Sequence, residues 1–239
     1  MAAGTRHGLA RILSKRGLCS RSEAERLIRE GRVRVGGRIV QDPERPTRLD
    51  EAGIEIEGMA ASARVRRCFM LNKPRGLVTI ARDEHGRDTV YRCFDDADLG
   101  WIAPVGRLDK ASEGLLLFTS DPAWASAITD PLRGPDKTYH VQVDRVPGHE
   151  ELMALVAGIE SDDVTLSAKS ALLLRSGGKT AWLEIVLEEG RNRQIRKMLA
   201  ALDIGVLRLI RVAIGPLQLG ELPKGQWREL NADEINALG

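Results

Sequence analysis

The first 38 residues carry a strongly one-sided charge. Residues 6–38 hold ten lysines and arginines and only three acidic residues, whereas residues 39–60 hold two basic and six acidic ones. The whole chain of 239 residues balances 36 Lys and Arg against 34 Asp and Glu, so the total hides this asymmetry. A basic segment of this kind is the electrostatic signature of contact with a phosphate backbone. Any fold for this chain must therefore present a basic surface near its N-terminal end.

The basic segment also has the pattern of a folded unit. Apolar residues recur at helical spacing over 9–13 and again over 24–28, which predicts two helices. Ser20, with Glu23 three positions later, is a helix start signal, and Gly17 and Gly31 can end the two helices. Alternation on both sides of a Gly-Gly pair predicts a β-hairpin over 32–40. In this hairpin we expect Arg32, Arg34 and Arg38 on the wet face and Val33, Val35 and Ile39 on the inner face.

The stretch 7–58, with the pattern LARILSKRGLCSRSEAERLIREGRVRVGGRIV, resembles the small RNA-binding domain named after ribosomal protein S-four. In that family the helices and the hairpin hold basic residues against folded RNA. The resemblance therefore implies RNA binding by this segment; a solvated basic surface without a ligand is the alternative. The candidate RNA contacts here are Arg11, Arg16, Arg21, Arg26, Arg29 and Arg34.

A second domain follows a short linker. Residues 61–66 lack periodicity, so we place a linker there, between a first domain over 1–60 and a second over 67–239. The predicted strands are 68–71, 77–80, 115–118, 139–143 and 181–187, and the predicted helices are 122–128, 150–156 and 191–202. This order predicts an α+β chain whose second domain has a mixed, largely antiparallel sheet with flanking helices.

Several classes of protein lack support in the sequence. The three cysteines, Cys19, Cys68 and Cys93, are far apart and form no metal-ligand spacing, so we expect no metal site and a reducing compartment. No motif for a nucleotide cofactor is present, and we expect no cofactor. Apolar runs are far shorter than the ~20 residues of a membrane span, and the N-terminal residues do not resemble a secretory signal. We therefore expect a cytoplasmic protein that does not contact membranes.

One short motif presents a carboxylate beside an apolar strand. In G-R-L-D-K-A-S-E-G-L-L-L, residues 106–117, Asp109 lies between Arg107 and Lys110. Two glycines allow the tight backbone that such a loop needs. Asp109 is thus a candidate reactive group, although a turn aspartate is the ordinary alternative. A glycoside hydrolase pair of Asp109 and Glu113 is disfavoured, because no second acidic motif or aromatic sugar platform accompanies it.

Two further segments carry candidate side chains. On the predicted strand over 137–143, Tyr139 shares a face with valines 141 and 143, so it is a core tyrosine or a ring that contacts a ligand. In the predicted helix 191–202, Arg196 borders the apolar stripe that Ile195 begins. Residues 191–211 hold six basic residues and one acidic residue, which makes a second basic region.

The motifs taken together resemble the pseudouridine synthases, in particular the bacterial rRNA enzymes of RsuA type. Besides 106–117, the matching strings are L-N-K-P-R-G at 71–76, G-R-D-T-V at 86–90, K-T-Y at 137–139, E-G-R-N-R-Q-I-R-K-M at 189–198, R-L-I-R at 208–211 and G-P-L at 215–217. The resemblance implies isomerisation of uridine to pseudouridine in RNA, with Asp109 as the catalytic residue. It also implies that Tyr139 stacks on the base and that Arg196 pairs with Asp109.

The resemblance also implies the partner. We expect ribosomal RNA or a ribosomal subunit assembly intermediate, with large-subunit RNA favoured by E-G-R-N-R at 189–193, and no obligate protein partner. Further candidate contacts with RNA phosphates around the cleft are Lys73, Arg75, Arg107 and Arg193. The alternative is a ribosome-assembly factor that binds RNA without catalysis. The target uridine and the choice between a covalent step at Asp109 and deprotonation of the ribose stay open.

Overall fold

The computed structural model describes residues 6–58, 67–81 and 83–239 and separates the chain into two compact units. The first unit contains the N-terminal residues up to Cys68, together with 98–103 and 119–125, and the second contains the rest. Each unit is described by itself below. The linker predicted at 61–66 lies outside the described residues.

The first unit builds two helices and short strands from the pattern described above. Its helices are α1 (Leu9–Lys15) and α2 (Arg21–Arg29). Ser20 caps α2, because its side chain accepts a hydrogen bond from the N–H of Glu23. Strand β2 (Val33–Val35) pairs with β3 (Arg38–Ile39) and β5 (Ile54–Ile56), and β1 (Arg6–Gly8) pairs with β4 (Pro46–Arg48). The helices and β2 share one core, formed mainly by Leu9, Leu13, Leu27, Ile28, Val33 and Ile56.

The hairpin forms as predicted, but both residues of β3, Arg38 and Ile39, lie on the face opposite to the predicted one. Gly36 and Gly37 both have positive φ, as the two-residue turn requires. Val33 and Val35 are buried, whereas Ile39 is 56% exposed. The register pairs Ile39 with Arg34 and Arg38 with Val35, and paired residues lie on the same face. A two-residue turn therefore puts Ile39 on the wet face with Arg34, contrary to the prediction.

The second unit is built around a nine-stranded sheet. Its main order is β12 (Ser170–Ser176), β13 (Ala181–Leu187), β9 (Lys137–Val143), β14 (Val206–Ile214), β8 (Glu113–Thr119), β6 (Cys68–Lys73) and β16 (Trp227–Glu229). Two short strands extend it, with β15 (Leu217–Gln218) on β14 and β7 (Ala103–Val105) on β8. The strands from β12 to β14 are antiparallel and β14 is parallel to β8, so the predicted mixed, largely antiparallel α+β architecture is confirmed.

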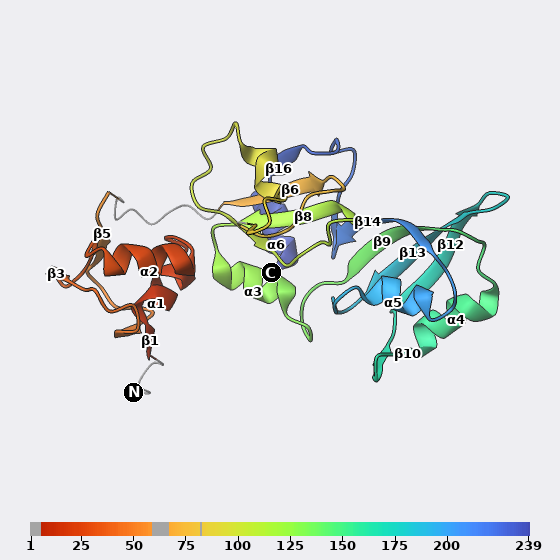
Figure 1. Ribbon diagram of the computed structural model, residues 1–239, viewed down its shortest axis with the longest axis horizontal. Coiled ribbons are helices and arrows are strands. Elements are labelled where there is room, and N and C mark those ends of the chain that lie inside the picture. Colours follow the sequence, from red (N-terminus) through yellow and green to blue (C-terminus); the bar gives the residue numbers. More distant parts are fainter. Residues whose placement is uncertain (1–5, 59–66, 82) are drawn as a thin grey trace. The chain divides into compact units, whose positions relative to one another are not determined.

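Helices accompany both ends of this sheet. Strands β6, β8 and β16 lie at one end with α6 (Ala232–Leu238), and β12 lies at the other with α4 (His149–Ala157), as Figure 1 shows. Helix α3 (Pro122–Thr129) follows β8 in the chain and begins in residues of the first unit. Helix α5 (Gln194–Ala200) precedes β14. A single 3₁₀ helix, η1 (Val90–Phe94), and the hairpin of β10 (Ile159–Ser161) with β11 (Val164–Leu166) complete the elements of this unit.

Two predicted elements differ from the structure. Residues 77–80 form no strand, and only Val78 makes a bridge, to Thr89. The reason lies in tertiary contacts, since the hydroxyl of Thr79 donates to the carbonyl of Leu108 and ties this segment to the next loop. The helix predicted from residue 191 begins at Gln194, because Arg193 has a left-handed backbone with φ 53°.

Candidate active site

A cavity of about 590 Å³ opens in the second unit, within the size range of ligand sites in proteins. Several segments line it. The main ones are the loop 105–109, the segment 128–132 at the end of α3, the segment 189–195 that leads into α5, and, counted together, side chains of the sheet strands β9 and β14. Asp109 and Tyr139, two residues predicted to be catalytic, both line this cavity. The structure therefore brings together residues that are 30 positions apart in the sequence.

The loop that carries Asp109 is fixed mainly through its backbone. The carbonyl of Asp109 accepts hydrogen bonds from the N–H of Ser112 at 2.9 Å and from Nζ of Lys73 at 3.2 Å. Gly114, at the start of β8, has φ 99°, and a Cβ there would lie 2.2 Å from the carbonyl oxygen of Arg211. Only glycine allows β8 to approach β14 this closely. These constraints place the Asp109 carboxylate at the edge of the cavity.

Lys73, predicted as a contact for RNA phosphates, is buried and supports this loop. Its side chain has no exposed area, and its Nζ donates to the carbonyls of Pro74, Asp109 and Ser112. Burial lowers the pKa of Lys73 to about 8, although the negative charge of Asp109 opposes that shift. This burial was not predictable from the sequence, because lysine is among the residues least often found inside proteins.

Asp109 makes its ion pair with Arg193 rather than with Arg196. Nη1 of Arg193 lies 3.6 Å from Oδ2 of Asp109, and no ion pair of Arg196 with Asp109 is found in the described part of the chain. Arg196 lies one helical turn further along α5 and is half-buried. Burial and the charge of Arg193 lower the pKa of Arg196, whereas the charge of Asp109 raises it. Arg196 thus remains within electrostatic reach of Asp109 without pairing with it.

Tyr139 lies on the face of β9 that was predicted. The strand alternates buried and half-buried residues, and Tyr139, Val141 and Val143 are buried together with Lys137. The ring is 8% exposed and lines the same cavity as Asp109. An aromatic ring in this position can stack on a planar ligand.

Three polar residues of the cavity wall were not singled out from the sequence. Lys137, Ser112 and Arg211 all line the cavity, and each is at most 9% exposed. Lys137 and Arg211 stand in motifs noted above, but charged residues on strands are ordinarily exposed. For Lys137 and Arg211, the alternation of strand residues could have indicated the burial. Lys137 is two positions from Tyr139 on β9, and Arg211 is two positions from Leu209 on β14, so each shares a face with an inward residue.

The other candidate contacts near the cavity divide into two groups. Arg107 and Arg193 line the cavity and are exposed, so both can reach a ligand from solvent. Arg75 is exposed, does not line the cavity, and lies close enough to Arg196 to lower its pKa.

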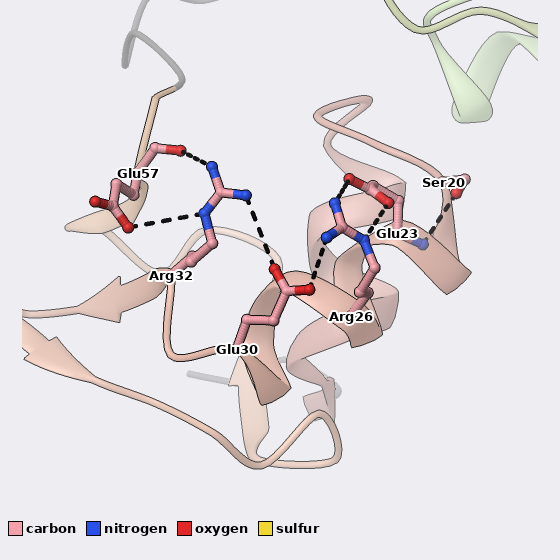
Figure 2. Close-up of polar contacts among 6 residues, drawn as sticks. All are labelled: Ser20, Glu23, Arg26, Glu30, Arg32 and Glu57. Carbon is pink, nitrogen blue, oxygen red and sulfur yellow. Dashed lines mark hydrogen bonds and ion pairs between the residues drawn. The ribbon is translucent and has the colours of Figure 1, made fainter.

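The arginines of the first unit differ in how much of their charge is free. Arg26 contacts Glu23 at 2.6 Å and Glu30 at 2.7 Å, and Arg32 lies between Glu30 and Glu57 (Figure 2). Arg21 and Arg29 share Glu25, each at 3.5 Å. Among the residues that the structure describes, Arg11 and Arg34 form no ion pair and are exposed.

Arg16 has a structural role. Its guanidinium donates to the carbonyls of Leu49 and Glu51, which ties the end of α1 to the turn after β4. Of the six arginines predicted to contact RNA in this unit, Arg11, Arg16 and Arg34 have no carboxylate partner within the described ranges, and Arg16 is held by the carbonyls of Leu49 and Glu51. Arg11 and Arg34 are therefore the two best able to offer their charge to a ligand.

The described residues can be examined for a metal site and for a helix that could span a membrane. Across 6–58, 67–81 and 83–239, no group of three His, Cys, Asp or Glu side chains could hold a metal ion. None of the helices in those ranges has the length and apolar character needed to cross a membrane.

Comparison with known proteins identifies the family. The model of the RNA pseudouridylate synthase family matches residues 67–201, and that of the S4 domain matches residues 8–50. An uncharacterized RNA pseudouridine synthase of Aquifex aeolicus is 36% identical over 229 residues, 95% of this chain and 92% of the relative. The ribosomal large subunit pseudouridine synthase B of Bacillus subtilis is 36% identical over 96% of this chain and 94% of its own length.

The three-dimensional comparison agrees. The crystal structure of a pseudouridylate synthase superposes with a TM-score of 0.69 at 29% identity and covers 99% of this chain and 100% of that one. Sequence and fold thus lead to the same conclusion along nearly the full length. This chain belongs to the RNA pseudouridine synthase family and carries an S4 domain ahead of its catalytic domain.

Proposed function

We propose that the protein isomerises one uridine of large-subunit ribosomal RNA to pseudouridine, with Asp109 as the catalytic carboxylate. The observation that supports this proposal is the cavity that Asp109 and Tyr139 both line, in a chain of this family. Relatives named ribosomal large subunit pseudouridine synthase B support the choice of RNA. The substrate is free ribosomal RNA or a subunit assembly intermediate in the cytoplasm.

The proposed chemistry uses side chains in and next to the cavity. The bond between the ribose and the uracil nitrogen breaks, the base turns, and it rejoins the ribose through carbon five. Asp109 either attacks the nucleotide covalently or removes a proton from the ribose. Tyr139 stacks on the uracil, which must leave the RNA stack to enter the cavity. Arg193 orients the Asp109 carboxylate through their ion pair, and Arg196 adds positive potential.

The two domains divide the work in this proposal. The domain over 1–60 binds RNA phosphates, mainly through Arg11 and Arg34, and the domain over 67–239 performs the reaction. Arg75, Arg107 and Arg193 are proposed to contact phosphates near the cavity. The alternative function, an assembly factor that binds RNA without catalysis, requires the same basic surface but no reactive carboxylate.

Tritium release tests the proposal directly. Wild-type protein, given large-subunit RNA labelled with tritium at carbon five of uridine, should release tritium as pseudouridine forms. Asp109→Asn should lower the single-turnover rate at least about 10³-fold and leave RNA binding within a factor of about 3, since it removes only the reacting group. The matched control is Asp96→Asn, an exposed aspartate that does not line the cavity, and it should keep wild-type activity.

The outcomes separate the two functions. Full activity of Asp109→Asn would contradict the catalytic assignment. Tight binding of ribosomal RNA by a wild-type protein that releases no tritium from either subunit's RNA would favour the assembly factor.

A further inference from the structure

Buried polar atoms without partners gather at the cavity. Within the described ranges, three side-chain atoms are buried and lack a hydrogen bond, namely Oγ of Ser112, Nε of Arg196 and Nη2 of Arg211. Ser112 and Arg211 line the cavity, and Arg196 follows Ile195, which also lines it. Nearly all buried polar groups in folded proteins are hydrogen-bonded. Their concentration here indicates that a ligand supplies the missing partners.

Arg211 is the most constrained of the three. It is 5% exposed, and its Nε donates to the carbonyl of Leu115 at 2.7 Å, which fixes the guanidinium against β8. In the register of β14 with β9, Arg211 is paired with Tyr139. Its guanidinium is therefore held beside the ring that is proposed to stack on the uracil.

The charge of Arg211 is also uncompensated. No carboxylate pairs with Arg211 or Lys137 in the part of the chain that the structure describes, and Asp136, next to Lys137, pairs with Lys169. Burial and the charge of Arg211 lower the pKa of Lys137, whereas the charge of Asp136 raises it, so the two cations are neighbours. Two buried cations with no ion pair of their own in the described ranges make this wall of the cavity complementary to a ligand that carries or develops negative charge.

We infer that Arg211 binds a carbonyl oxygen of the extruded uracil and stabilises the negative charge that the base gains during the reaction. The guanidinium has only donors, so its partner must be an acceptor such as O2 or O4 of uracil. A backbone phosphate is a less suitable partner for Arg211, because the RNA backbone stays outside the cavity. The exposed Arg107 and Arg193 are better suited to bind such a phosphate. This inference rests on the proposed function.

The charge arises in one defined step. When the bond between C1′ of the ribose and N1 breaks, its electron pair stays on the uracil and is delocalised over O2 and O4. The same base then forms a bond from C5 to C1′, the proton on C5 leaves, and N1 gains a proton, so atoms and electrons balance. A fixed guanidinium that faces O2 or O4 lowers the energy of the anionic base more than that of the neutral one, as donors in an oxyanion hole do.

Substitution of Arg211 with two substrates tests the inference. Arg211→Met should lower the single-turnover rate of tritium release from labelled uridine RNA by about 10²–10³-fold. The Kd for the same RNA should stay within a factor of about 3, because most contacts lie outside the cavity. With RNA that contains 5-fluorouridine at the target, the defect should shrink at least about tenfold, since fluorine itself stabilises the anionic base. Consumption of fluorouridine is followed by nuclease digestion and mass spectrometry.

Two further variants keep the test decisive. Arg211→Lys retains a cation and should recover at least about tenfold of the lost rate, with folding checked by the melting temperature. Arg175→Met removes an exposed arginine that lies over Trp182, outside the cavity, and should match wild type.

The outcomes distinguish this inference from the proposed function. A wild type that releases no tritium contradicts the proposed function. An active wild type contradicts the inference alone if Arg211→Met keeps its rate, loses only RNA affinity, or shows the same defect with both substrates.

Discussion

The basic residues of the two units have opposite surroundings. In the first unit most arginines are exposed and many face carboxylates, as Arg26 and Arg32 do in Figure 2. In the wall of the cavity Lys137 and Arg211 are buried and have no carboxylate partner among the described residues. The number of basic residues in a segment therefore does not tell how much positive charge is available to a ligand. What matters is whether a partner within the chain has already neutralised each one.

The acidic segment after residue 39 shows how this happens. In the sequence it is separate from the basic segment, yet Glu57, directly after β5, contacts Arg32, and Glu44 contacts Arg21. In the folded chain, acidic residues of 39–58 therefore form ion pairs with arginines of 21–32. Exposed ion pairs of this kind contribute little stability, so their main effect is on the charge that remains available for RNA.

Lys73 gives the largest expected effect on stability, because it is a buried cation whose amino group donates only to carbonyls in the described structure. Its folded pKa of about 8 lies below the ordinary 10.5, so between these values the unfolded chain binds more protons than the folded one. Wild-type stability should therefore rise with pH across that window, by about 3 kcal/mol relative to Lys73→Met. Urea unfolding at pH 7, 8, 9 and 10 measures the difference between the two proteins.

The control for this prediction is an exposed lysine. Asp136 raises the pKa of Lys169 above its ordinary value, so Lys169 stays charged in both states up to pH 10. Lys169→Met should therefore differ from wild type by a constant amount over the same range. If the difference in unfolding free energy between wild type and Lys73→Met does not change with pH, burial does not lower the pKa of Lys73 and the prediction is wrong.

Substitution of Arg16 should have an intermediate effect on stability, because this cation is held by backbone carbonyls near the surface. Arg16→Met leaves the carbonyls of Leu49 and Glu51 without their donor, and we expect a loss of about 1–2 kcal/mol in the first unit. Hydrogen exchange of the α1 and α2 amides measures it locally. Arg11→Met, on the same helix, should change protection by less than about 0.5 kcal/mol. Equal losses in the two variants would contradict a structural role for Arg16.

The sequence predicted the elements better than the polar contacts, for a physical reason. Strand β13 and helices α3 and α4 follow from local periodicity, and they occur within a residue or two of the predicted bounds. The burial of Lys73 and the pairing of Asp109 with Arg193 depend on contacts between distant segments. Arg193 and Arg196 are one helical turn apart, and only the left-handed backbone at Arg193 distinguishes them. The Tyr139 face was predictable because a strand alternates strictly.

The smallest expected effect is on the salt dependence of RNA binding, and it distinguishes arginines without an ion pair from arginines that a carboxylate neutralises. Arg34→Gln removes an exposed charge that forms no ion pair in the described structure, so the slope of log K against log salt should fall by about 0.7–0.9. Arg26→Gln removes a guanidinium whose pKa Glu23 and Glu30 already raise, and a phosphate would have to displace both carboxylates. Its slope should therefore stay close to wild type. Filter binding of ribosomal RNA between 50 and 300 mM salt (about a sixfold range) measures both slopes. If Arg26→Gln lowers the slope as much as Arg34→Gln does, intramolecular pairing does not decide which arginines meet RNA, and the contrast between the two units fails.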